Sequence, residues 1–391
     1  MKVASVKVER LTHGSDHYFY GYYDNPAWSR DGKWHLAHRV KFWDRLPAAN
    51  DKAEIGLIRL NDDEFQPIAE TSAWNFQQGA MLQWNPLKPN EEILFNIRCG
   101  EGYCGAVLNV YTGQQRLLEK PIANVDPTGK YALSVSFDRM FQFRPGYGYC
   151  SNLTDAVREA ADADHPHDDG VWRVDLTSGR SELILSLHQI WEFTKAAFHG
   201  QNQKILINHI NFNTDGTRFV MLVRNFPKPG ERWSTAAVTA NADGSDLHLL
   251  LDYSLVSHYH WKDRDHLVIF CKHPASGTNG LYVLKDRTNE IEAVDSRFFV
   301  FDGHCSYSPD RKWLLYDSYP DKDSFRHLYL YDLEAKTWLS LGSFYSDPIS
   351  TGDYRCDLHP RWNAAGTAVS FDSTHEGQRH IYMMDLKEIL S

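Results

Sequence analysis

Four histidines recur at the same position of a short phrase, His-x-x-aromatic, in the second half of the chain. The copies are His209-Ile-Asn-Phe212, His258-Tyr-His-Trp261, His304-Cys-Ser-Tyr307 and His359-Pro-Arg-Trp362. A neutral imidazole binds transition metals, and it also takes up and releases protons near neutral pH. Equivalent positions of successive units meet near one axis in a radial repeat fold. We therefore expect the four side chains to converge on one site.

A cysteine completes a possible metal-binding set. Cys356 stands three residues before His359, in the phrase Cys-Asp-Leu-His. A thiolate together with neutral imidazoles is the ligand set of zinc. We predict a divalent metal, zinc by this ligand chemistry, bound by His258, His304, Cys356 and His359. The alternative is a group of histidines bonded to backbone and water. The pattern leaves open whether the metal is catalytic or structural.

Three residues are predicted to be catalytic: Arg224, His209 and His258. Arg224 ends the strand that is predicted to begin near His209, so both side chains are expected at the same mouth of the repeat. A guanidinium can neutralise an anionic substrate, and an imidazole can take a proton from it. A surface ion pair is the alternative interpretation of Arg224.

Four further residues are predicted to bind substrate: Arg98, Gln78, Asn96 and Tyr259. Arg98 stands at a similar strand end, with Asn96 and Gln78 expected close to it in the fold. Tyr259 is a candidate hydrogen-bond donor. A surface ion pair for Arg98 and a structural role for Tyr259 are the alternatives.

Several other classes of function are excluded by the sequence. It has no P-loop, no dinucleotide fingerprint after a strand and no nucleophile elbow, and its carboxylates are scattered in turns rather than paired as in a glycosidase. A formal net charge of −10 argues against a nucleic-acid partner. Neither a signal-peptide core nor a bilayer-spanning apolar run is found, so we expect a soluble, cytoplasmic protein without a membrane partner.

The six cysteines show no disulfide framework. This usage fits a reducing compartment. Cys99 and Cys104 are close enough in sequence to pair, but two free thiols are the expectation.

The histidine phrases lie in a larger repeat that predicts the fold. An anchor residue, a turn-like stretch and an apolar strand recur seven times, and an alternating strand with a polar turn follows each copy. Three of the turns contain an Asp-Gly or Pro-Asp pair, which is typical of tight hairpins. The anchors are Trp28, Trp84, Val125, Phe212, Trp261, Tyr307 and Trp362. Together the two motifs predict an all-β protein, a seven-bladed β-propeller of four-stranded antiparallel blades, as one domain over residues 1–391.

This repeat is irregular in two places. The last blade runs out of chain after its third strand, and the alternating segment 3–11 is predicted to supply the missing outer strand. The spacing from Val125 to Phe212 is nearly twice that from Trp261 to Tyr307. We attribute the excess to an insertion at about residues 138–170, which is either a lid over one face or a solvated loop.

Five segments together resemble a known family. They are Phe19–Pro47, Trp74–Trp84, Phe143–Tyr149, His304–Asp321 and Cys356–Tyr382. In combination they are similar to the seven-bladed propeller polysaccharide lyases, with oligogalacturonate lyase and the propeller ulvan lyases as the nearest types. The resemblance covers nearly the whole chain and is most specific in its second half.

The resemblance to oligogalacturonate lyase implies roles for individual residues. That enzyme holds a manganese with histidines and a glutamine in its last blades, and has an arginine and a further histidine at the substrate. His304 and His359 match the metal ligands, Cys356 takes the place of the glutamine, His258 matches the further histidine and Arg224 the arginine. Manganese is thereby the alternative to zinc.

The resemblance to the ulvan lyases is less complete. Those enzymes carry a structural zinc and use histidine, tyrosine and arginine for elimination. Gln78 and Arg98 stand here near the places of their two catalytic histidines, which puts ulvan-type activity in doubt.

From these observations we predict a lyase that cleaves uronic-acid-containing oligosaccharides by β-elimination. The enolate-like charge that forms when the C5 proton leaves must be stabilised by a cation or a metal. Two alternatives stay open. One is a hydrolase like the α-L-rhamnosidases that act on rhamnose-glucuronate, and the other is a non-catalytic propeller scaffold with a structural metal.

Overall fold

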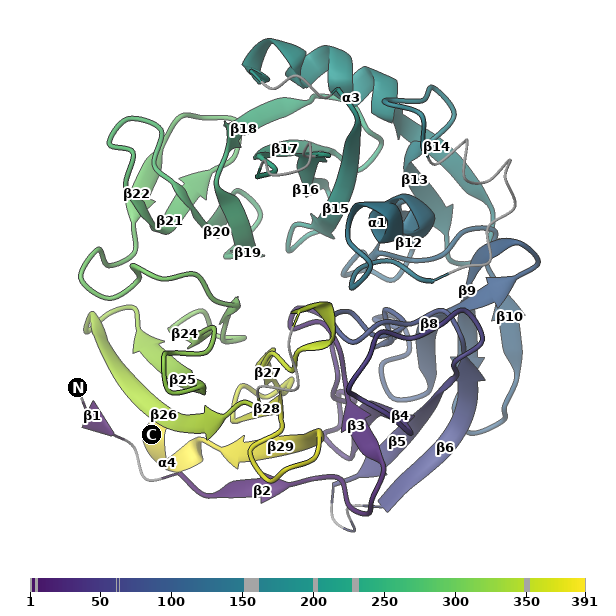
Figure 1. Ribbon diagram of the computed structural model, residues 1–391, viewed down its shortest axis with the longest axis vertical. Helices are drawn as coiled ribbons and strands as arrows, with labels where there is room; N and C mark the ends of the chain where they lie inside the picture. The colour runs from purple at the N-terminus through teal and green to yellow at the C-terminus, as the bar shows by residue number, and fades with distance from the viewer. Residues whose placement is uncertain are drawn as a thin grey trace. The chain divides into compact units, whose positions relative to one another are not determined.

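The computed structural model describes residues 2–3, 6–60, 62, 64–150, 162–199, 203–226, 232–347 and 352–390. Across these ranges the strands form seven sheets, six of four strands and one of five. Within each sheet, strands that follow one another in sequence pair antiparallel. The predicted all-β fold, a seven-bladed β-propeller, is confirmed (Figure 1).

By its internal contacts the chain divides into two compact units. Unit 1 comprises Met1–Arg98, Val107–Gln115 and Gly303–Ser391, and unit 2 comprises Cys99–Ala106 and Arg116–Asp302. One sheet contributes residues to both units. Its strands are β7 (Gln83–Trp84), β8 (Glu92–Cys99), β9 (Gly102–Asn109) and β10 (Gln115–Leu117).

Unit 1 contains three further sheets. The first consists of β3 (His17–Phe19), β4 (Trp34–Val40), β5 (Ala53–Arg59) and β6 (Glu64–Thr71). The second consists of β23 (Cys305–Tyr307), β24 (Trp313–Asp317), β25 (Phe325–Asp332), β26 (Thr337–Tyr345) and the short β1 (Lys2–Val3). The third consists of β27 (Arg361–Trp362), β28 (Ala368–Ser373), β29 (His380–Asp385) and β2 (Val8–Arg10). Unit 1 also contains two short helices, η2 (Gly352–Tyr354) and α4 (Lys387–Leu390).

Unit 2 also contains three further sheets. The first consists of β11 (Asn124–Val125), β12 (Tyr131–Ser134), β13 (Gly170–Asp175) and β14 (Ser181–Ser186). The second consists of β15 (Ile205–Phe212), β16 (Arg218–Asn225), β17 (Thr235–Asn241) and β18 (His248–Ser254). The third consists of β19 (Val256–Trp261), β20 (His266–Lys272), β21 (Asn279–Lys285) and β22 (Ile291–Ala293). Its helices are α1 (Phe137–Phe143), α3 (Leu187–Thr194) and η1 (Lys195–Ala197).

The N-terminal segment completes the last sheet, as the sequence predicts. β2 pairs antiparallel with β29, with Val8 opposite Met384 and Arg10 opposite Tyr382. In Figure 1 the purple β2 therefore runs beside the yellow β29. Of the predicted segment 3–11, residues 8–10 form this strand, whereas Lys2–Val3 pair parallel with β26 of another sheet.

Apolar clusters between neighbouring sheets hold the first strands in place. In unit 1, Leu315 and Leu328 of one sheet pack with Val369 and Phe371 of the next. In unit 2, Leu222 belongs to the cluster that also contains Tyr259 and Trp261. Full burial of an aliphatic or aromatic side chain of this size contributes about 1.5–3 kcal/mol. This packing fixes the strands from which the histidine phrases extend.

The predicted insertion is described in part. Its beginning forms α1, which packs beside β15 (Figure 1). The helix-like acidic stretch lies mostly at residues 151–161, which are outside the described residues. Among the helices that the structure does describe, none has the length and apolar character required to cross a lipid bilayer.

One expectation about the cysteines is wrong. Cys99 and Cys104 form a disulfide across the β8–β9 hairpin, with their Cα atoms 5.7 Å apart. The hairpin brings the two residues face to face, which their sequence spacing alone does not establish. Cys150, Cys271, Cys305 and Cys356 take no part in this disulfide and carry thiols.

Thiol titration of the denatured protein tests this pairing. Without reductant we expect four reactive thiols, because four cysteines take no part in the disulfide. After reduction we expect all six cysteines of the sequence to react. Six reactive thiols before reduction would show that Cys99 and Cys104 are not joined in the isolated protein.

Candidate metal centre

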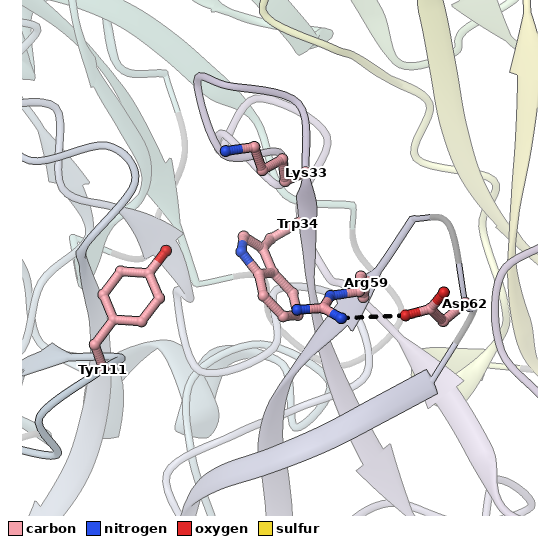
Figure 2. Close-up of a pocket in the computed structure, with 5 residues that line it drawn as sticks. All are labelled: Lys33, Trp34, Arg59, Asp62 and Tyr111. Carbon is pink, nitrogen blue, oxygen red and sulfur yellow. Dashed lines mark hydrogen bonds and ion pairs between the residues drawn. The ribbon is translucent and has the colours of Figure 1, made fainter.

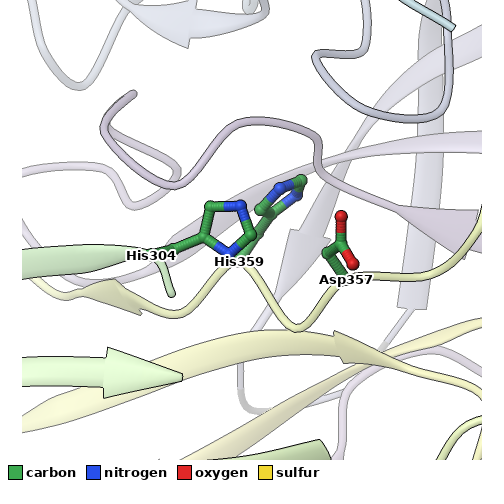
Figure 3. Close-up of side chains that lie close together, drawn as sticks. All are labelled: His304, Asp357 and His359. Carbon is green, nitrogen blue, oxygen red and sulfur yellow. The ribbon is translucent and has the colours of Figure 1, made fainter. Parts of the chain in front are cut away.

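Two histidines and an aspartate lie together in unit 1. His304 directly precedes β23, and Asp357 and His359 precede β27. One ligand atom from each residue lies within 4.8 Å of the others. The two imidazole rings are 4.2 Å apart at their centroids and nearly perpendicular, at 81° (Figure 3). All three side chains are buried. Two imidazoles and a carboxylate are donors that divalent metals bind, so these residues form a candidate metal centre.

A second carboxylate orients His304. Asp317, at the end of β24, lies 2.9 Å and 3.0 Å from the His304 Nδ1 through its two oxygens, and it accepts a hydrogen bond of 2.7 Å from the His304 backbone N–H. Histidine ligands of metals usually donate their other ring N–H to a carboxylate in this way. The pairing places the proton on Nδ1, so the Nε2 lone pair is the donor that would bind a cation.

His359 is held in a conformation that costs free energy. Its φ angle is 42°, in the left-handed region that side chains other than glycine seldom adopt. Such strain costs about 1–3 kcal/mol and is typical of functional sites. The buried Nδ1 of His359 has no hydrogen-bond partner among the described residues. Burial, followed by the neighbouring His304, lowers the pKa of His359 well below its ordinary value, so the ring is neutral. A strained, neutral and unsatisfied imidazole fits a metal ligand.

Two arginines keep the third donor ionised. Arg326 Nη1 lies 2.7 Å from one Asp357 oxygen and Arg355 Nε lies 2.8 Å from the other. Burial raises the pKa of the Asp357 carboxyl, but the charges of Arg355 and Arg326 outweigh it and hold the pKa well below the ordinary value. Asp357 is therefore a carboxylate, and its charge would remain available to a cation.

Asp357 was missed by the sequence analysis, which selected its neighbour. The Cys356 sulfur lies 3.9 Å from the backbone oxygen of Asp357, and Cys356 is not one of the three clustered residues. Burial raises the pKa of the Cys356 thiol to about 11, which disfavours the thiolate that a metal needs. The donor that the structure brings to His304 and His359 is thus the carboxylate, and a ligand role for Cys356 stays a prediction.

Aromatic side chains flank the two histidines. Tyr23 lies over His304 with ring centroids 5.1 Å apart, and Tyr22 lies edge-on to His359 at 5.7 Å. Both tyrosines are buried and belong to the Gly-Tyr-Tyr segment between β3 and β4. Gly21 makes that approach possible, because its φ is 119° and a Cβ there would meet the backbone of Gln78 at 2.8 Å.

The other two predicted histidines belong to unit 2. His258 lies on β19, and its Nδ1 is 3.0 Å from an oxygen of Asp302, whose other oxygen accepts a 2.7 Å hydrogen bond from Ser257. His209 lies on β15, with its ring 5.9 Å from that of Tyr147 in the insertion. The His258–Asp302 pair has the arrangement in which a carboxylate orients an imidazole.

Strand register places Arg224 with His209. A β-bulge in β15 at Asn208 sets His209 opposite Leu222 on β16, two residues from Arg224. Side chains two residues apart on a strand share a face, so His209 and Arg224 lie on the same face of this sheet. Arg224 also stacks over Trp233, at 5.9 Å from the ring centroid. The expectation that the two face one mouth of the repeat stays a prediction.

The predicted substrate-binding residues make local contacts. Arg98 donates to Ser72 Oγ at 3.4 Å and to the Ala49 carbonyl at 3.3 Å. The Asn96 backbone N–H donates to the Ala80 carbonyl, and the Asn96 carbonyl accepts from the Thr71 hydroxyl. Gln78 is buried, and the Tyr259 hydroxyl donates to Asn211 at 2.6 Å. These contacts neither require nor test a role in substrate binding, which stays a prediction for all four.

A surface pocket elsewhere in unit 1 contains none of these residues. It measures about 450 Å³ and is lined by Lys33, Trp34, Arg59, Asp62 and Tyr111 (Figure 2). Arg59 stacks over Trp34 at 5.1 Å and forms an ion pair of 3.3 Å with Asp62. Lys33 forms an ion pair of 3.1 Å with Asp31, outside the lining.

Similar solved structures share the fold. No family model and no curated protein matches the sequence. Oligogalacturonate lyase from Vibrio parahaemolyticus matches 100% of this chain over 96% of its own, with a TM-score of 0.67 and 16% identity. The chain has a fold similar to that of oligogalacturonate lyase. An oligogalacturonate lyase in complex with manganese gives a TM-score of 0.68 at 15% identity, with the same coverage of 100% and 96%.

Peptidase propellers are also similar in fold. The β-propeller domain of the Trilobed protease from Pyrococcus furiosus matches 95% of this chain over 96% of its own, with a TM-score of 0.55 and 11% identity. At such identities the likeness establishes the fold alone. The resemblance to oligogalacturonate lyase drawn from the sequence is confirmed as a likeness of fold, and the activity must be argued from the site.

Proposed function

We propose that the chain is a carbohydrate-active lyase that cleaves uronic-acid-containing oligosaccharides by β-elimination with the help of a divalent cation. The observation that carries the proposal is the buried group His304, Asp357 and His359. The likeness in fold to an oligogalacturonate lyase in complex with manganese supports it. Uronic acids carry a carboxylate, which a cation would bind and neutralise.

The three residues fit such a cation. They would hold it through two imidazole nitrogens and a carboxylate oxygen, a set of three protein ligands that leaves positions open for a substrate, as in catalytic rather than structural sites. The bound ion would supply positive charge that stabilises the enolate-like transition state. The mixed nitrogen and oxygen donors suit manganese as well as zinc.

Residues of this chain are assigned the remaining tasks. His258 is our candidate for the base that takes the C5 proton, because its Nδ1 is engaged by Asp302 and its Nε2 would accept the proton. Arg224 is assigned to bind the substrate carboxylate. His209, the third residue predicted to be catalytic, lies on the same face of the sheet as Arg224. Arg98, Gln78, Asn96 and Tyr259 remain the proposed substrate-binding residues.

A product assay tests the proposed reaction. Purified protein should be incubated with uronate-rich oligosaccharides in the presence of manganese or zinc, and absorbance in the near ultraviolet should be followed. Elimination leaves a double bond conjugated to the carboxylate, so absorbance should rise. Chain cleavage without that absorbance would indicate the rhamnosidase-like hydrolase. Absence of cleavage over a broad set of uronic oligosaccharides would favour the non-catalytic scaffold.

Replacement of Arg224 tests its assigned role. We expect Arg224→Ala to lower kcat by about 100-fold to 1,000-fold, the usual loss when one group that stabilises developing negative charge is removed. Arg224→Lys should retain part of the activity, since it keeps the charge but loses the planar fork. Arg264→Ala is the matched control, because Arg264 is an exposed arginine of the same unit. Unchanged turnover in Arg224→Ala would remove this residue from the mechanism.

A further inference from the structure

Three histidines that the proposed reaction does not use gather in unit 2. His165 and His167 belong to the phrase His-Pro-His that follows the undescribed part of the insertion, and His188 lies in the first turn of α3. The Nδ1 atoms of His165 and His188 are 3.4 Å apart. The ring of His167 lies on that of His188, with centroids 3.8 Å apart.

The distance between the Nδ1 atoms of His165 and His188 matches that between two ligands of one zinc ion. Two nitrogens bound to one tetrahedral zinc ion at about 2.0–2.1 Å are separated by about 3.4 Å. The Nδ1 atoms of His165 and His188 have this separation, which is also that of a long hydrogen bond between the two rings. The pair therefore has the spacing of two ligands of a single metal ion.

The surrounding structure holds this pair in place. The His188 backbone N–H donates to the Pro166 carbonyl at 3.1 Å, and Leu187 N–H donates to the Asp169 carbonyl at 2.7 Å. A capping box between Ser186 and Gln189 fixes the start of the helix. Trp191 stacks on the His165 ring at 5.4 Å with an interplanar angle of 6°. The two segments are thus joined by backbone bonds before any ligand binds.

A carboxylate stands where a further ligand would come from. Glu192 follows His188 by one helical turn on α3, and residues four apart share a helix face. The hydrogen bond from Lys195 lowers the pKa of the Glu192 carboxyl, and the charges of His188 and His165 lower it further. Glu192 and His167 are exposed, whereas His165 and His188 are half-buried. The two exposed side chains can therefore rotate toward an ion held by His165 and His188.

We propose that His165, His167 and His188, with Glu192, form a second metal site, specific for a divalent d-block cation such as zinc. Imidazole-rich sites select zinc, copper or nickel over magnesium and calcium. A cation bound there would tie residues 164–169 to α3, at the end of the insertion. The site is independent of the group at His304, because none of its residues is shared with it.

Zinc titration of the full-length protein tests the proposal. Isothermal titration of wild type with zinc chloride should show one more bound equivalent than the same titration of the double variant His165→Ala/His188→Ala. Glu192→Gln should weaken that equivalent by about 10-fold or more, the scale seen when groups at a metal site are removed. His266→Ala is the matched control, because His266 is a partly exposed histidine on β20 of the same unit that lies outside the cluster.

Copper provides a second measurement, which reports the ligands of the bound ion directly. Electron paramagnetic resonance of wild type loaded with one equivalent of Cu²⁺ in excess of the His304 group should show a second copper signal beside that of the His304 group, coupled to at least two imidazole nitrogens. That second signal should vanish in His165→Ala/His188→Ala and persist in His266→Ala. Equal zinc stoichiometry in wild type and the double variant would overturn the proposal, whatever the outcome for the His304 group.

Discussion

We expect His359→Asn to lose the cation bound at the candidate metal centre and to lower turnover by about 100-fold or more. The loss follows because one imidazole ligand is removed, and a metal typically contributes several kcal/mol to stabilising a charged transition state. Asparagine is the sharper substitution, since it tolerates the left-handed backbone that His359 adopts at φ 42°. The fold should therefore survive, and the effect can be assigned to the side chain.

Metal content and turnover measured on the same preparations check this expectation. His375→Asn is the matched control, because His375 is a half-buried histidine of the same unit whose ring contacts Phe344 and Tyr382. It should keep both metal and turnover. A His359→Asn protein that retains wild-type turnover would contradict the assignment of His359, and one that retains metal but not turnover would restrict its role to the substrate.

The second large effect is expected on stability. We expect Asp357→Ala to lower the free energy of unfolding by about 3–5 kcal/mol, the range for breaking a buried ion pair. Arg326 and Asp357 are 3% and 0% exposed, so the variant leaves a buried guanidinium without its carboxylate. Arg355 loses the same partner. The cost comes from the uncompensated charges rather than from lost packing.

Urea unfolding followed by circular dichroism measures this cost. The double variant Asp357→Ala/Arg326→Met should regain part of the lost stability, because it removes one of the stranded charges. Asp385→Ala is the control, since Asp385 is 55% exposed in its ion pair with Lys387, and such surface pairs contribute about 0–1 kcal/mol. A change below about 1 kcal/mol in Asp357→Ala would show that Asp357 is not held as a buried carboxylate.

The blades could be predicted from sequence because their signals are local. Turn glycines follow the anchors Trp28, Phe212 and Trp362, at Gly32, Gly216 and Gly366, and all three adopt positive φ angles of 70°, 73° and 67°. The same register predicted that His304 and His359 meet, because each lies just before the first strand of its sheet, one residue before β23 and two residues before β27. Equivalent positions in the sequence repeat therefore predicted which residues lie close together in the fold.

The identity of the third donor could not be obtained in the same way. Cys356 and Asp357 are adjacent in a segment without regular structure, so no strand alternation decides which side chain faces His304. Chemical preference for a thiolate favoured the cysteine. Of the two arginines that hold Asp357, Arg355 is two residues away in the same irregular segment, and Arg326 lies on β25. The acids that orient the histidines were missed for the same reason: Asp317 and Asp302 lie 13 and 44 residues from His304 and His258.

Anomalous X-ray diffraction from crystals grown with manganese or zinc tests the central assignment most directly. We expect one peak at the metal's absorption edge bonded to an imidazole nitrogen of His304, one of His359 and a carboxylate oxygen of Asp357, at about 2.0–2.2 Å for zinc. A peak bonded to Cys356 instead of Asp357 would correct the ligand set. Crystals that hold metal elsewhere but show no peak within reach of these three residues would contradict the account.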